Sequence, residues 1–291
     1  MLWTAFLGSF VVIALWETIA PAKLLRFSTG RRWAISGFLA FLNSLISWVI
    51  HRAAALLVAS ASFRESEGLL SNPSLHWGVA LLLALPLLDL VRYLQHRAFH
   101  SVPWLWRFHR VHHADPDYDL TTALRFHPGE TLFTEGSYLV AIALLGPPPL
   151  AVLAVDAIVL FQNFFTHANA NLPSAWSRAL DWIWITPGLH RSHHSVEFAS
   201  QQTNFGTIFP WWDRLFGTFR RDPSGRVDFA VGLEGLAPEQ ALELGATLRM
   251  PLQPLTESSN TVRSSSTSSA SITPSETTTN ESPAMIGKAP S

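Results

Sequence analysis

Residues 77–113 read WGVALLLALPLLDLVRYLQHRAFHSVPWLWRFHRVHH. An apolar run from Trp77 to Leu94 passes directly into a segment that holds five histidines. The apolar part is about long enough for a helix to cross the roughly 30 Å hydrocarbon core of a bilayer. This stretch therefore predicts a membrane helix whose end carries histidines to one face of the membrane.

Further apolar runs indicate more membrane helices. Leu2 to about Ala20 and Trp33 to Ile50 carry almost no charge, and between Ser137 and Thr166 the only charged residue is Asp156. Residues 146–149, Gly-Pro-Pro-Pro, divide this last run into a hairpin of two short helices, because proline does not continue a helix. The N-terminal run lacks a basic flank and a cleavage site, so we interpret it as an anchor. We predict an all-α integral membrane bundle of about four to five membrane helices, since a soluble fold would struggle to bury so many such runs.

The positions of basic residues predict the orientation. Lys23, Arg26, Arg31 and Arg32 fill the first loop, which the positive-inside rule places in the cytoplasm. The helix that follows Trp77 then ends on the same side, so both histidine-rich segments are expected to face the cytoplasm. We expect residues 95–136 and 167–235 to form a cytosolic helical cap.

The chain divides into three predicted parts. Residues 1–74 hold the N-terminal membrane helices, 75–235 the catalytic domain, and 236–291 a C-terminal extension. From about residue 257 the composition is rich in Ser and Thr, which predicts disorder. Five tryptophans are candidates for headgroup-level anchors or for ordinary aromatic core: Trp176, Trp182, Trp184, Trp211 and Trp212.

Composition excludes several function classes. The net charge of −1 excludes a nucleic-acid binder that works by overall basicity. The chain has no cysteine, which excludes a thiolate nucleophile, a zinc–thiolate site and an iron–sulfur cluster. Only 14% of residues are charged, against about a quarter in soluble domains.

The histidines form three compact motifs. His96 and His100 make an HxxxH, whose spacing puts both rings on one helix face within reach of one metal. Two HxxHH motifs follow. In each, the first histidine and the histidine three residues later share a helix face, and the last histidine lies close but is rotated by about 100° from its neighbour. One helical turn can thus supply ligands to two neighbouring metals, and imidazole suits Fe, Zn, Cu and Ni. The HxxHH motifs consist of His109, His112 and His113, and of His190, His193 and His194.

Other residues are candidates for the same centre. His167, four residues after Asn163, and His127, three before Glu130, are predicted as further ligands. Asn163 is a candidate ligand, a holder of a metal-bound water, or a helix cap. Candidate partners that orient the ligands, or else surface charges, are Asp89, Asp115, Glu130 and Asp181. Phe99, Phe126 and Phe164 are candidates for a lipid channel or for core packing.

This arrangement resembles the fatty acid hydroxylase superfamily, also called the sterol desaturase family. The resemblance covers roughly residues 75–220 and rests on the HxxxH and both HxxHH motifs, in order, around a membrane hairpin. Arg-Phe-His-Pro-Gly-Glu (125–130), His-Ala-Asn (167–169) and Thr-Asn-Phe-Gly (203–206) are also similar to that family. The resemblance implies a membrane protein with two non-haem irons that uses O2 and a reductant to hydroxylate or desaturate a lipid.

Electrons are expected to come from a separate protein of the ferredoxin or cytochrome b5 type. The sequence shows neither a Gly-rich dinucleotide fingerprint nor a cysteine cluster. Candidates for a basic docking face are Arg92, Arg97, Arg107, Arg110 and Arg191, which the positive-inside rule explains equally well.

A lipid hydroxylase is the leading hypothesis, and three alternatives remain. A sterol or fatty acyl desaturase could use the same site. A membrane zinc hydrolase is disfavoured because no HExxH is present and the histidines are too many for one zinc. A metal transporter or sensor is disfavoured because it would place polar groups at mid-membrane depth.

Overall fold

The computed structural model describes residues 2–59, 68–72, 74–221 and 229–254. Within these ranges the protein is helical and has no named strand. The five long helices are α1 (Leu2–Ile19), α2 (Thr29–Ala59), α3 (Trp77–Ser101), α5 (Pro128–Leu145) and α6 (Pro149–Thr166). The short helices are α4 (Pro103–His113), η2 (Leu120–Leu124), α7 (Ser174–Leu180), α8 (Pro187–His193), α9 (Phe198–Gln201), α10 (Trp211–Leu215), α11 (Pro238–Ala241), α12 (Leu244–Arg249) and η3 (Met250–Leu252).

Three helices among the described residues are long and apolar enough to cross a membrane. They comprise residues Thr29–His51 of α2, all of α3 and all of α6. By length and composition alone, these are fewer than the four to five membrane helices expected. Helix α1 is a shorter apolar helix (Trp3–Ile19), and α5 carries Glu130 and Glu135 near its start. Apolar side chains such as Val12, Leu45 and Leu82 lie exposed on these helices, as expected in contact with lipid.

The predicted break between the two hairpin helices is confirmed. Helix α5 ends at Leu145 and α6 begins at Pro149. Gly146 between them has φ of +61°, a left-handed conformation that glycine adopts without steric cost. A Cβ at Gly146 would lie 2.0 Å from Ser71 Oγ, so only glycine fits this turn.

Three apolar clusters hold the long helices together. One joins α3, α5 and α6 through residues such as Leu88, Tyr138 and Val155. A second packs α1 on α6, which lie side by side, through Ile13 and Phe164. The third packs α2 against α4 and the C-terminal segment; it contains Ile35, Leu39, Val111, Ala241 and Met250.

A buried ion pair fixes α2 to the loop that follows α4. The guanidinium of Arg32, which is fully buried, donates to Asp115 at 2.6 and 2.9 Å and to Asp119 at 2.5 Å. Arg125 lies beside this pair, and the two cations hold the pKa of Asp115 below its usual value despite burial. Arg32 therefore acts in the interior, whereas the sequence grouped it with the basic residues of the first loop.

The segment 238–254, assigned from sequence to a C-terminal extension, packs on the catalytic part. Arg107 donates to the carbonyls of Pro251 and Gln253, and Arg110 to those of Met250, Gln253 and Pro254. The tail that was expected to be disordered from about residue 257 lies outside the described residues.

One predicted surface role needs correction. Arg110 and Arg191 are buried, and Arg191 donates to the carbonyls of Ala168 and Ala170, so neither belongs to a basic docking face. Of the five tryptophans proposed as anchors or as core, Trp184 and Trp212 are only half-exposed. Trp184 packs against the apolar cluster that joins α3, α5 and α6, and Trp212 Nε1 donates to Asp89 of α3. Trp176, Trp182 and Trp211 are exposed.

Candidate metal centre

Four helices deliver nine histidines to one place. α3 ends with His96 and His100, α4 carries the first HxxHH and α8 the second, and His167 directly follows α6. Pro103 and Pro187, each at the first position of its helix, start α4 and α8 with the backbone angle that a helix needs. The six histidines of the two HxxHH motifs therefore lie on, or directly after, short helices whose starts are fixed by the sequence.

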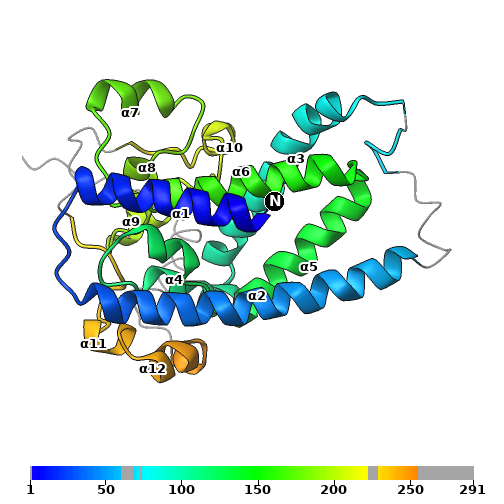
Figure 1. Ribbon diagram of the computed structural model, residues 1–291. Helices are drawn as coiled ribbons and strands as arrows, with labels where there is room; N and C mark the ends of the chain where they lie inside the picture. The colour runs from blue at the N-terminus through cyan, green and yellow to red at the C-terminus, as the bar shows by residue number, and fades with distance from the viewer. Residues whose placement is uncertain (1, 60–67, 73, 222–228, 255–291) are drawn as a thin grey trace, which may run out of the picture.

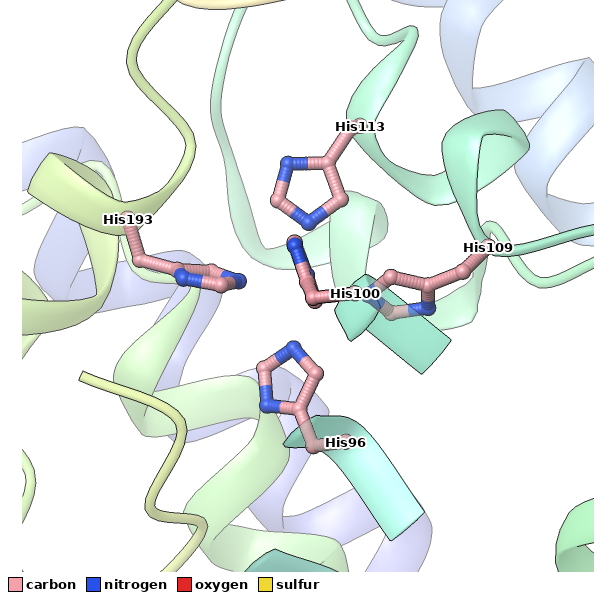
Figure 2. A group of neighbouring side chains, drawn as sticks. All are labelled: His96, His100, His109, His113 and His193. Atoms are coloured by element: carbon pink, nitrogen blue, oxygen red, sulfur yellow. The ribbon is translucent and has the colours of Figure 1, made fainter. Parts of the chain in front are cut away.

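The nine histidines form two groups. In each, one ring nitrogen per residue lies within 4.8 Å of every other. The five-histidine group contains His96, His100, His109, His113 and His193 (Figure 2), and the four-histidine group contains His112, His167, His190 and His194. Figure 2 shows the five rings converging on a common centre.

Each of the two HxxHH motifs contributes histidines to both groups. In α4 the outer histidines, His109 and His113, belong to the five-histidine group and His112 to the other. In the second motif, His193 alone joins the five-histidine group, while His190 and His194 join the other. The histidines spaced by four share a group in both motifs, because i and i+4 lie one above the other on a helix.

Burial keeps six of the imidazoles neutral. It holds the pKa of His112, His113, His190 and His194 well below the ordinary value, and neighbouring imidazoles lower it further. Burial likewise lowers the pKa of His167 to about 4 and that of His193 to about 3. Neutral imidazole is the form that binds metal.

The ring nitrogens fit a metal on two further counts. Several are buried without a hydrogen-bond partner among the described residues, including both nitrogens of His100 and of His113. Such orphaned polar atoms are costly unless something else satisfies them. In the four-histidine group, His167 Nε2 lies 3.2 Å from His112 Nε2 and 3.1 Å from His190 Nε2. Nitrogens bound to one ion at about 2.0–2.1 Å, in tetrahedral or octahedral arrangement, lie about 2.9–3.4 Å apart.

Outer partners orient four of the rings. Glu130 Oε1 lies 2.6 Å from His109 Nδ1. Backbone carbonyls accept from the others: Thr203 O lies 2.7 Å from His193 Nδ1, Phe205 O 2.9 Å from His96 Nδ1, and Asn163 O 2.7 Å from His167 Nδ1. A carbonyl only accepts, so these three Nδ1 atoms carry the proton and Nε2 is free to bind a metal.

Comparison with known proteins agrees with this site. Residues 81–218 match the family model described as fatty acid hydroxylase. This part of the chain is therefore similar to the fatty acid hydroxylase superfamily. The matched range contains all eight histidines of the three motifs, together with His127 and His167.

Three relatives illustrate this superfamily. The ornithine lipid hydroxylase OlsE of Rhizobium tropici is 29% identical over 238 residues, which are 77% of this chain and 69% of that protein. Human cholesterol 25-hydroxylase is 30% identical over 48% of the chain, and Xenopus tropicalis alkylglycerol monooxygenase is 35% identical over 45%. The chain spans about half (51%) of the former and just over a quarter (28%) of the latter. No solved structure matches the chain.

His127 lies apart from both histidine groups. It caps the start of α5: its Nδ1 accepts from the Gly129 amide at 2.9 Å, and its Nε2 lies 3.2 Å from Leu248 O. The residue before a helix-starting proline is a natural capping position, a signal that was present in His-Pro-Gly. The structure thus does not bring His127 to the predicted ligand set.

The remaining candidates have varied roles. Asn163 reaches His167 through its backbone carbonyl. Of the four candidate acids, Glu130 alone hydrogen-bonds a histidine. Asp89 accepts from backbone amides, Asp115 from Arg32, and Asp181 from Thr186. Phe99 stacks near His109 and Phe126 on His112, whereas Phe164 packs with Phe6 and Phe10 in the core.

Sequence reasoning did not identify Thr203 and Phe205 as partners of the histidines. They act through backbone carbonyls, which every residue possesses, so no side-chain type marks them. The only available signal was the family-like string Thr-Asn-Phe-Gly at 203–206.

Proposed function

We propose that this protein is a di-iron oxygenase that uses O2 to hydroxylate a lipid at the membrane surface. The observation that carries the proposal is the pair of adjacent histidine groups, built at the ends of apolar helices. The superfamily relatives named above are hydroxylases or monooxygenases whose names refer to ornithine lipid, cholesterol and alkylglycerol. The site and the relatives together therefore support hydroxylation of a lipid best.

The residues have separable tasks in this proposal. The five-histidine group would hold one iron and the four-histidine group the other, and bound iron would supply the activation of O2. Glu130 and the carbonyls of Thr203, Phe205 and Asn163 hold protons at Nδ1 and keep Nε2 aimed inward. Because all ligands are neutral, the positive charge of the metals is retained within a buried site.

An apolar cleft supports a lipid substrate. It has a volume of about 440 Å³ and lies between α3, α4 and α5; its lining comprises Val91, Leu94, Gln95, Ala98, Phe99, Trp104, Leu105, Phe133 and Ser137. Leu94, Trp104 and Phe133 are exposed at its mouth. Phe99 at its inner end is buried, with its ring centroid 5.5 Å from that of His109. An acyl chain in this cleft would therefore lie one side chain away from a ligand of the five-histidine group.

We further propose that the centre faces the cytoplasm and receives electrons from a separate ferredoxin-type or cytochrome b5-type protein. Lys23 and Arg26 between α1 and α2, and Arg31 in the first turn of α2, support this orientation. Reporters inserted after Arg64 and fused at the C-terminus should report opposite sides of the membrane. The same side for both would contradict the topology.

The test of the reaction is labelled O2. Cells that express the protein are grown with isotopically labelled O2, and their lipids are compared by mass spectrometry with those of cells expressing His112→Ala or His193→Ala. We expect a lipid with one labelled hydroxyl oxygen in the wild type only. A new double bond without label would instead indicate desaturation, and a cleaved lipid without label would indicate hydrolysis.

A further inference from the structure

Residues 203–210, between α9 and α10, contact two histidines that come from different helices. We call this segment the carbonyl strap. Thr203 O accepts from His193 Nδ1 of α8 and Phe205 O from His96 Nδ1 of α3, at 2.7 and 2.9 Å. The Nε2 atoms of both histidines are buried without a hydrogen-bond partner among the described residues. Two ligands of the five-histidine group therefore take their tautomer from one short piece of backbone.

A buried carboxylate holds the strap in shape. Asp213 is fully buried, and its Oδ1 accepts from the Phe205 amide at 2.8 Å and from Thr218 Oγ1 at 2.7 Å. Its Oδ2 accepts from the Gly206 amide, also at 2.8 Å. The two amides that it binds flank the Phe205 carbonyl, so the carboxylate fixes the peptide group that bonds His96.

Asp89 fastens the far half of the strap to α3. Its Oδ1 accepts from the Ile208 amide at 2.9 Å, and its Oδ2 from the Phe209 amide at 3.1 Å and from Trp212 Nε1 at 3.0 Å. Asp89 and His96 are seven residues apart, two helical turns, and therefore lie on nearly the same face of α3. One helix face thus provides both the anchor of the strap and the ligand that the strap orients.

Asn204 fastens the near half to α8. It is fully buried with φ of +57°, a conformation uncommon outside glycine. Its Nδ2 donates to Arg220 O at 2.7 Å and lies 3.2 Å from Ser192 Oγ on α8, and its Oδ1 accepts from the Arg220 amide at 2.9 Å. Ser192 is the neighbour of His193, so this contact holds the strap against the helix that carries the second ligand.

We propose that Asp213 and Asn204 are positioning residues, which set the protonated nitrogen and the ring orientation of His96 and His193 through the carbonyl strap. The inference rests on the proposed metal centre. It predicts that damage to the strap weakens metal binding at the five-histidine group and leaves the four-histidine group intact.

Asp213→Asn tests this with a matched control. The amide has one accepting oxygen, so one of the two amides at Phe205 and Gly206 loses its acceptor and meets an NH2 group. Asp117→Asn is the control for replacing a buried carboxylate by an amide, because Asp117 is also buried and its Oδ2 accepts from the amides of both Arg26 and Phe27, each at 2.8 Å. Asp117 makes no hydrogen bond to the strap among the described residues.

The readout is Co²⁺ titration of the full-length metal-free protein, followed by the visible absorption of the bound ion, together with thermal unfolding. We expect wild type and Asp117→Asn to bind two ions, and Asp213→Asn to bind one of them about 10–100-fold more weakly with an altered spectrum. Asn204→Gly keeps the left-handed backbone and removes the side-chain bonds. Asn204→Gly should also weaken the binding of one Co²⁺ ion, by a smaller factor than Asp213→Asn. It replaces Asp213→Asn in the test if that variant does not fold.

The outcomes separate this inference from the proposed function. A wild type that binds no metal would overturn both. A wild type that binds two ions, with unchanged affinities and spectrum in Asp213→Asn, or in Asn204→Gly if only that variant folds, would overturn the inference alone. Equal losses in Asp213→Asn and Asp117→Asn would also overturn it, because the effect would then be general destabilisation.

Discussion

The two histidine groups share both HxxHH motifs but are supported differently. The five-histidine group has a carboxylate, Glu130, and two strap carbonyls behind its rings. In the four-histidine group, His167 bonds a carbonyl of its own helix, α6. The five-histidine group also borders both cavities: Phe99 beside His109 ends the apolar cleft, and His100 lines a second cavity of about 190 Å³ under the C-terminal segment. We infer that the five-histidine group is the half of the centre that meets the substrate.

The largest expected effect is loss of a ligand. His113→Ala should remove the metal of the five-histidine group, and His194→Ala that of the four-histidine group. Each should lower lipid hydroxylation by more than about 100-fold, since even an outer partner of a ligand is worth 10–100-fold. Metal content and product are measured on the same purified samples. If either variant kept two metals and full activity, the assignment of that group would be wrong.

A smaller effect is expected from the outer carboxylate. Glu130→Gln leaves an amide beside His109 and should reduce metal affinity about 10–100-fold at the five-histidine group only. Glu135→Gln, one turn further along α5, is the control, because its partners are Ser47 and His51. An equal effect on both metals would show that Glu130 does not distinguish the groups.

The pH dependence of the metal-free protein tests the buried neutral imidazoles in both groups. The pKa of His167 is lowered to about 4 and that of His193 to about 3, from an ordinary 6.5. Between pH 6.5 and those values the unfolded chain binds protons that the folded chain does not, so the free energy of unfolding falls as pH falls. Thermal melts should therefore show Tm decreasing from pH 7 to pH 5. A constant Tm would contradict the burial of both residues.

The smallest effect is expected at the C-terminus. Removal of residues 255–291 should leave activity unchanged, because their composition does not support a packed core. Removal of residues 250–291 should lower activity and stability, because Arg107 and Arg110 lose the carbonyls that they bind. Equal activity of the two truncations would show that the segment 250–254 does not support the centre.

Local patterns predicted much of this architecture. The spacing of His96 and His100 places both on one helix face whatever surrounds them, and Gly146 with its three prolines interrupts any helix. The helical bundle and the gathering of the motif histidines could therefore be predicted.

Features that depend on how helices face one another could not be predicted. Which histidine of an HxxHH motif joins which group depends on how its helix, α4 or α8, approaches the centre. His112 and His193 occupy the same position in their motifs, yet His112 joins the four-histidine group and His193 the five-histidine group. The strap carbonyls and the interior position of Arg110 also arise from tertiary packing. His127 was misleading because a histidine before a helix-starting proline can cap the helix as well as bind a metal.

The central claim is tested most directly by the iron content of active protein. The protein is purified in detergent, loaded with iron, and analysed for metal per chain while lipid hydroxylation is measured on the same preparation. The account predicts about two irons per chain and activity proportional to iron. One zinc per chain, with activity independent of iron, would contradict it.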